Sequence, residues 1–159
     1  MRSPPANSTT IVVIDPSHPE GDAGLAALTD TDVVVAIVVP VYGPCARTLH
    51  EFAHAEAIDV GTASSLYLDQ IAGCVDASNR RVVLVTVDGV DLVHDLLTFA
   101  DTVSVSRFIV PASVAGYRGI SIDDLVGRSS VPVTIVPVLE HDESGGNEGP
   151  YARWWRRAA

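Results

Sequence analysis

A five-residue stretch at positions 50–54 has the sequence His-Glu-Phe-Ala-His and is the most specific chemical motif in the chain. On a helix, its two histidines share a face and can chelate zinc, while the glutamate acts as a general base. The third ligand of the metzincin pattern is missing, because Ala57 and Val60 stand where a glycine and a histidine are required. Thr48 precedes Glu51 by three residues, so this pair predicts a capping box with Glu51 in the first helical turn.

Cys45 offers a second way to build a metal site from the same histidines. Cys45, His50 and His54 have a Cys-x4-His-x3-His spacing just after an apolar run, and Asp15 is a candidate fourth ligand. The competing interpretation is a small buried cysteine beside two helical histidines. A zinc-dependent hydrolase that uses His50, Glu51 and His54 is therefore one alternative function.

The charge composition excludes several classes of partner. The 159 residues include 20 acidic and 10 basic residues, every basic one is Arg, and the net charge is −10. This acidity predicts that the protein binds neither nucleic acid nor anionic membranes. A mean hydropathy of +0.28 indicates a folded core rather than a disordered chain.

The cysteines and the apolar runs indicate a reducing, aqueous compartment. Cys45 and Cys74 form no Cys-x-x-Cys pair, and two cysteines make no disulfide framework. The longest apolar run, residues 33–42, is about half as long as a membrane helix. We expect a cytoplasmic protein with free thiols.

Composition divides the chain into three parts. Residues 1–9 resemble a flexible leader, residues 10–139 form one α/β domain, and residues 140–159 form a flexible tail that is first acidic and then rich in Arg and Trp. Trp154 and Trp155 lie beside arginines, so the tail is a candidate docking segment for the acidic body or for a protein partner. The alternative is a chain end without function.

The elements that position these residues alternate between strands and helices. Near-continuous apolar, β-branched runs predict buried parallel strands at residues 11–14, 33–41, 82–87, 108–110 and 133–136. Helices are predicted at residues 90–100, with Asp88 as cap and Asp91 in the first turn, at 121–127 with Ser121 as N-cap, and in two pieces over 47–78. At most one short helix is expected within 22–28. The pattern predicts a doubly wound α/β sheet whose ligands bind at the carboxyl ends of the strands.

Three segments of the domain resemble the universal stress protein family. They are IVVIDPS at residues 11–17, TVDGVDLVHDLLTFAD at 86–101 and GISIDDLVGRSSVPVTIVPV at 119–138. Their order and spacing follow that family's first strand, its third strand and helix, and its final helix and strand. The resemblance implies a single doubly wound parallel five-stranded sheet, of the type shared with the adenine nucleotide alpha hydrolases.

ATP-binding members of this family carry a glycine motif that this chain lacks. The family pattern is Gly, two residues, Gly, nine residues, then Gly followed by Ser or Thr, and its backbone amides hold phosphates. Here Gly119 matches the third glycine, but Ile120 replaces the hydroxyl residue, and Pro111 and Ala112 end the strand where the earlier glycines are needed. The resemblance therefore implies a degenerate nucleotide site.

Five positions still match the family's ligand contacts. Asp15 matches the acid beside the nucleotide, Val41 matches a strand end that flanks a base, and Arg118, Gly119 and Ser121 can hold an anion at a helix start. The function expected is a non-catalytic stress or regulatory protein without a bound cofactor. The alternative is a protein that binds ATP or AMP through a rearranged loop.

The resemblance also implies a homodimer. Members of the family commonly pair through their final strand, which corresponds here to residues 132–138. Unpaired main-chain groups of an edge strand are a template for such pairing.

Overall fold

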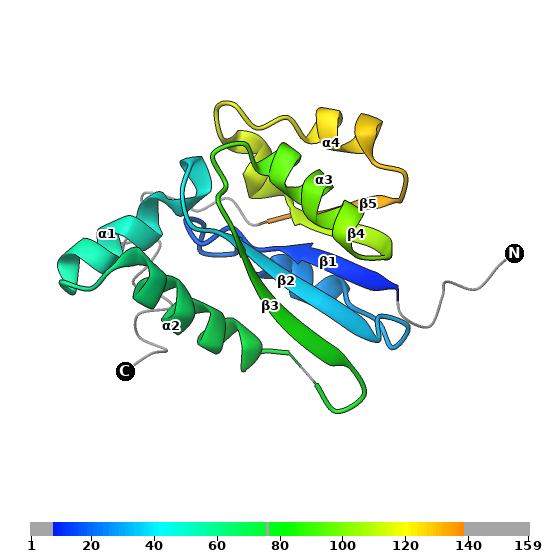
Figure 1. Cartoon of the computed structure of the whole chain (residues 1–159), viewed down its shortest axis with the longest axis horizontal. Helices are drawn as coiled ribbons and strands as arrows, with labels where there is room; N and C mark the ends of the chain where they lie inside the picture. The colour runs from blue at the N-terminus through cyan, green and yellow to red at the C-terminus, as the bar shows by residue number, and fades with distance from the viewer. Residues whose placement is uncertain (1–7, 76, 139–159) are drawn as a thin grey trace, which may run out of the picture.

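Five parallel strands form one sheet in the computed structural model, which describes residues 8–75 and 77–138 (Figure 1). The strands are β1 (Thr9–Val13), β2 (Val34–Pro40), β3 (Arg81–Val87), β4 (Val105–Pro111) and β5 (Val133–Val136). Their order across the sheet is β3-β2-β1-β4-β5, and all four pairings are parallel. This order is that of a doubly wound fold, so the predicted fold class is confirmed.

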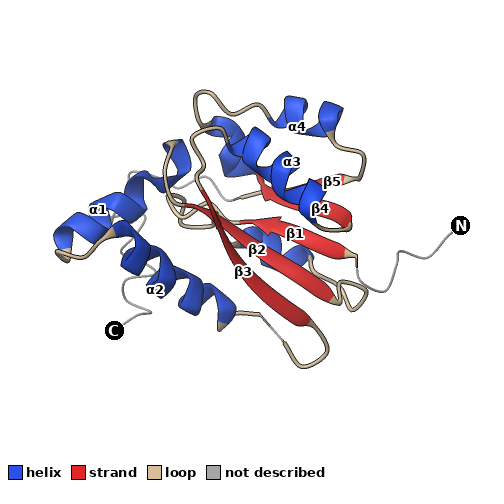
Figure 2. Cartoon of the chain, in the orientation of Figure 1, coloured by secondary structure: helices blue, strands red, loops and turns tan. Residues whose placement is uncertain are grey.

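Helices cover both faces of the sheet (Figure 2). The 3-10 helix η1 (Ala23–Ala27) and helices α1 (Arg47–Ala55) and α2 (Val60–Ala72) cover one face, and α3 (Leu92–Thr102) and α4 (Ile122–Arg128) cover the other. Two further 3-10 turns, η2 (Pro44–Ala46) and η3 (Ala112–Gly116), follow the carboxyl ends of β2 and β4. No described helix has the length and apolar character needed to cross a membrane.

The three central strands, β2, β1 and β4, are apolar on both sides because each side packs on helices. In β1, Val12 contacts the core beneath α1 and α2, while Ile11 and Val13 contact the core beneath α3 and α4. All three side chains are fully buried. This two-sided burial explains why the strand sequences show near-continuous apolar runs rather than alternation.

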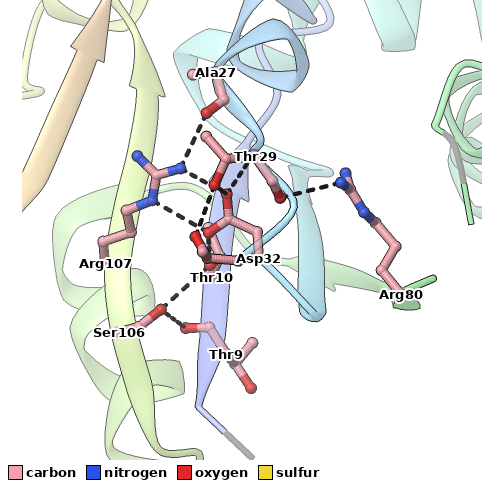
Figure 3. Close-up of polar contacts among 9 residues, drawn as sticks. Thr9, Thr10, Ala27, Thr29, Asp32, Arg80, Ser106 and Arg107 are labelled. Carbon is pink, nitrogen blue, oxygen red and sulfur yellow. Dashed lines mark hydrogen bonds and ion pairs between the residues drawn. The ribbon is translucent and has the colours of Figure 1, made fainter. Parts of the chain in front are cut away.

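A polar cluster closes the amino end of the sheet on the α1/α2 face (Figure 3). Asp32 precedes β2 and forms an ion pair with Arg107 of β4, with Nη2 and Oδ2 2.7 Å apart. Its carboxylate also accepts hydrogen bonds from the Thr10 hydroxyl at 2.6 Å and from the Thr29 amide at 2.7 Å. Arg107 further donates to the Ala27 carbonyl in η1. The cluster therefore ties η1 and two strands together where no long helix covers the sheet.

Most predicted elements are confirmed, with shifted ends. The helical region predicted over residues 47–78 divides into α1 and α2 as expected, but α2 ends at Ala72. Asp91, rather than Asp88, is the N-cap of α3 and accepts the His94 amide. Ser121 caps α4, as predicted.

The expected division into leader, domain and tail stays a prediction, because most of the leader and the whole tail lie outside the described residues. β1 begins at Thr9, so the last residue assigned to the leader is part of the sheet. The rest of the leader, except Ser8, and the Arg/Trp tail lie outside the described residues.

Candidate functional site

The carboxyl ends of β1 and β4 meet where the chain reverses its winding direction. β2 lies on one side of β1 and β4 on the other, so the segments that follow β1 and β4 diverge around a crevice. Asp15 and Ser17 follow β1, while Ser113 and Tyr117 follow β4. Ligands of doubly wound sheets bind at this position.

Asp15 is the central residue of this edge, and its carboxylate accepts hydrogen bonds from other residues of the same chain. The residue is fully buried. One carboxylate oxygen accepts the Ser17 amide at 3.1 Å and the Tyr117 hydroxyl at 3.0 Å. The other accepts the Ser113 hydroxyl at 2.7 Å. Ser113 and Tyr117 lie 98 and 102 positions after Asp15 in the sequence, and they supply two of its three hydrogen bonds.

Burial controls the ionisation of the groups around Asp15. Burial raises the pKa of Asp15, although its hydrogen bonds and the charge of His18 act in the opposite direction. Burial, with a further contribution from the Asp15 carboxylate, also raises the pKa of Cys45 and of Tyr117. Cys45 is thus a protonated thiol at neutral pH, which is the form without nucleophilic reactivity.

Ser17 joins this cluster to the start of α1. Its hydroxyl donates to the Cys45 carbonyl at 2.7 Å and accepts the Thr48 amide at 3.1 Å. The N-cap residue, Ala46, has no side-chain cap of its own. Ser17 therefore satisfies a free amide of the first helical turn from outside the helix.

The predicted capping box of Thr48 and Glu51 is wrong. Thr48 is the second residue of α1 and is buried, so it lies inside the helix instead of capping it. The Glu51 side chain forms an exposed i,i+4 ion pair with Arg47, with 3.1 Å between Nε and Oε1. The prediction failed because Ser17, 31 residues upstream of Thr48, supplies the hydroxyl that the local motif assigns to Thr48.

A cleft of about 350 Å³ opens beside this cluster. It is lined by Ser17, Pro44, Arg47, Thr48, Glu51 and Tyr117. The volume is near the lower end of the range for small-molecule sites. Ser17 and Tyr117 both line the cleft and both donate a hydrogen bond to the Asp15 carboxylate, so they link the cleft to the buried acid.

The five predicted ligand residues do not form one continuous surface. Asp15 is buried, and Val41 packs against the core beneath α1 and α2. Arg118 and Gly119 are exposed in the loop after η3. Ser121 is exposed, and its hydroxyl accepts the Asp124 amide at the start of α4.

Sequence reasoning missed Tyr117, which reaches Asp15 from the segment after β4. Ser17 and Ser113 belong to the strand ends where chemistry was expected, but their hydrogen bonds were not predicted. Nothing in the local sequence marks Tyr117, because its role depends on a contact across 102 residues.

The two histidines of the His-Glu-x-x-His stretch have different environments. His50 donates from Nε2 to the Val41 carbonyl, with 2.7 Å between nitrogen and oxygen. His54 is exposed, and Cys45 is buried with its side chain in the core beneath α3 and α4. Across residues 8–75 and 77–138, no group of three or more His, Cys, Asp or Glu side chains is arranged to hold a metal ion.

Two glycines fix the neighbouring ends of β2 and β3. Gly43 and Gly89 have positive φ values of 80° and 88°. A Cβ atom on Gly43 would collide with the Gly89 carbonyl, and one on Gly89 would lie 2.6 Å from the Tyr42 carbonyl oxygen. Direct backbone contact therefore closes this part of the sheet edge.

Among solved structures, the chain is similar to the crystal structure of a universal stress protein in complex with cAMP. The two are 17% identical, the TM-score is 0.49, and the match covers 82% of this chain and 97% of the other. That structure is of the family that the sequence resembles. No family model and no curated protein matches the sequence.

Proposed function

We propose that this protein is a non-catalytic regulatory protein whose strand-end nucleotide site is degenerate and closed by its own side chains. The observation that carries this proposal is that the Asp15 carboxylate is buried and hydrogen-bonded within the chain. The acid expected to face a ligand is fully buried, and three donors of the chain itself occupy its oxygens.

The segment after β4 supports the same proposal. A phosphate-binding loop needs free backbone amides at the start of a helix. Here α4 has only seven residues, and the Ser121 hydroxyl already accepts the Asp124 amide in its first turn. The missing glycines and the Ile120 side chain in place of a hydroxyl agree with this geometry.

The protonation states support a role without catalysis. Cys45 is the described thiol nearest to the cluster, and its raised pKa keeps it protonated. Ser17 and Ser113 donate to a carbonyl and to a carboxylate, and no described histidine is hydrogen-bonded to either hydroxyl. Activation of a serine nucleophile ordinarily requires an adjacent general base.

The second candidate function is binding of ATP or AMP, and the cleft beside Tyr117 favours it. Arg47 at the cleft rim offers the positive charge that a phosphate needs. Glu51 already pairs with this guanidinium and would repel the phosphate, so we rank this candidate second.

Isothermal titration with ATP and with AMP tests the two functions directly. We expect no heat of binding from either nucleotide at submillimolar concentration. Micromolar affinity that is lost in Asp15→Ala would overturn the proposal in favour of nucleotide binding.

A matched pair of arginine variants locates any binding that is observed. Arg47→Gln removes the cleft arginine, and Arg128→Gln removes an arginine in a comparable exposed i,i+4 pair with Asp124. Nucleotide binding in the cleft would be weakened by the first variant alone. A metal analysis of protein purified without added zinc completes the test, and we expect no bound zinc.

A further inference from the structure

β3 is a long edge strand with an exposed apolar surface. Among the described residues it is the outermost strand on its side of the sheet, with β5 at the opposite edge (Figure 1). It pairs with β2 over all seven residues without a bulge, and it contains no proline. Val83 is 37% exposed and Leu84 is 39% exposed. β3 thus lacks the bulges and prolines that usually protect edge strands from pairing.

The main-chain groups that β3 presents at this edge follow from its pairing with β2. The Arg81 amide donates to the Val33 carbonyl, and the Val87 carbonyl accepts the Val41 amide. In a parallel pair, both main-chain groups of a residue point to the same side of the strand, and the side alternates along the chain. The odd-numbered residues therefore face β2, and the amides and carbonyls of Val82, Leu84 and Thr86 face outward.

The opposite edge strand, β5, offers fewer main-chain groups for pairing with a second copy. β5 has four residues, and Pro132 and Pro137 flank it. Neither proline has an amide hydrogen to donate, which limits how far a ladder can extend. The β5 dimer expected from the family resemblance therefore has a shorter main-chain template than β3 provides.

We propose that two copies of this chain pair through β3, in antiparallel orientation, about a two-fold axis at Leu84. In this register Leu84 lies opposite the partner's Leu84, and Val82 lies opposite the partner's Thr86. All of these residues have outward-facing main-chain groups, so the ladder contains about six main-chain hydrogen bonds. The result is a continuous sheet through both copies with a self-complementary interface.

Charge along the strand favours a second copy in this orientation. Arg80 and Arg81 lie at the amino end of β3, and exposed Asp88 follows its carboxyl end. Antiparallel pairing brings the basic end of one copy to the acidic end of the other at both ends of the ladder. Parallel pairing would place like charges together, which is destabilising in cross-strand positions.

Sedimentation velocity on the full chain tests the proposal with matched edge variants. Leu84→Lys places two like charges opposite each other at the two-fold axis. Ile135→Lys makes the same kind of change on β5, where Ile135 is 45% exposed. We expect a wild-type dimer, a dimer dissociation constant raised about tenfold or more by Leu84→Lys, and no change with Ile135→Lys.

A second β3 variant distinguishes loss of pairing from a folding defect in Leu84→Lys. Arg81→Glu reverses an exposed charge at the end of the ladder and should also weaken the dimer, while circular dichroism reports whether each variant folds. A wild-type monomer overturns the proposal. So does a dimer that Ile135→Lys disrupts and the β3 variants leave intact, because that result assigns the interface to β5.

Discussion

Two buried carboxylates, Asp15 and Asp32, show how neighbours decide the ionisation of a residue. For Asp15, the cost of burial exceeds the effect of its neutral hydrogen-bond donors, and the pKa is raised. Asp32 also loses solvation, but the Arg107 guanidinium and two further donors lower its pKa to about 2. The guanidinium cation accounts for the difference: Asp32 has a positively charged partner that favours its ionised form, and Asp15 has only neutral donors in hydrogen-bond contact.

Asp15 should make stability fall as the pH rises. The ordinary pKa of 3.8 describes the unfolded chain, and the folded protein loses this proton only at a higher pH. Between the two values the folded state binds more protons, so the free energy of unfolding decreases with pH across that window. Asp15→Asn removes the titration. In denaturant unfolding from about pH 4 to pH 7, the stability of wild type relative to Asp15→Asn should decrease, and an increase would contradict the assignment.

Asp32 should act with the opposite sign and in a lower window. Its folded pKa of about 2 lies below the ordinary 3.8, so its stabilisation is present above pH 4 and is lost as the pH falls toward 2. At neutral pH, Asp32→Ala leaves Arg107 without its carboxylate and should cost about 2–3 kcal/mol. The control is Glu51→Ala, which removes an exposed ion pair and should change the free energy of unfolding by less than about 0.5 kcal/mol. Equal losses in urea unfolding would refute the structural role of Asp32.

At the scale of the elements, α1 depends on a residue from another segment. Ser17→Ala leaves the Thr48 amide and the Cys45 carbonyl without their hydrogen-bond partner, so we expect a loss of about 1–2 kcal/mol. Glu51→Gln should change stability by less than about 0.5 kcal/mol, since Glu51 makes only an exposed pair. Thermal and denaturant unfolding of the two variants measure the difference. A larger loss of unfolding free energy in Glu51→Gln than in Ser17→Ala would support the capping box instead.

Gly89 and Gly119 form a matched pair for the turns at the carboxyl edge. Their φ values are 88° and 89°, so alanine is strained to a similar degree at either position. A Cβ at Gly119 meets nothing within 4 Å, whereas one at Gly89 collides with Pro40 and the Tyr42 carbonyl. Gly119→Ala should cost about 1–2 kcal/mol, and Gly89→Ala should cost clearly more. Similar losses for the two variants would show that the backbone at Gly89 relaxes freely.

Elements were predicted correctly where the residues that determine them are close in sequence. They were predicted poorly where a residue from a distant segment determines them. The three central strands were found because two-sided burial requires continuous apolar runs, and the two edge strands because they are rich in valine and isoleucine. The Ser121 cap was found because its partner is three residues away. The start of α1 was misread because Ser17 caps it from a distance. The site was predicted only in part: Asp15 was identified, but the Tyr117 contact that occupies it forms only when β1 and β4 become neighbours.

At the scale of the whole molecule, the strand-end site and the proposed interface occupy different parts of the sheet. Asp15 lies at the end of the central strand, and β3 lies at an edge. Pairing through β3 therefore extends the sheet without using the cluster around Asp15. This separation makes the nucleotide titrations and the sedimentation experiments independent tests.

Net charge opposes the proposed dimer, and salt should therefore strengthen it. Each copy carries −10, so two copies repel over distances up to about the Debye length, roughly 30 Å at 0.01 M salt and 8 Å at 0.15 M. Salt also weakens the contacts between Arg80 and the partner's Asp88, but these are few, short-ranged and exposed, so each contributes little. The main-chain hydrogen bonds and the leucine contact at the axis are largely insensitive to screening. The dimer dissociation constant from sedimentation velocity should therefore fall between about 0.01 M and 0.15 M salt, while Leu84→Lys stays largely monomeric at both. A constant that rises with salt would mean that the charged ends, rather than the apolar centre of β3, hold the two copies together.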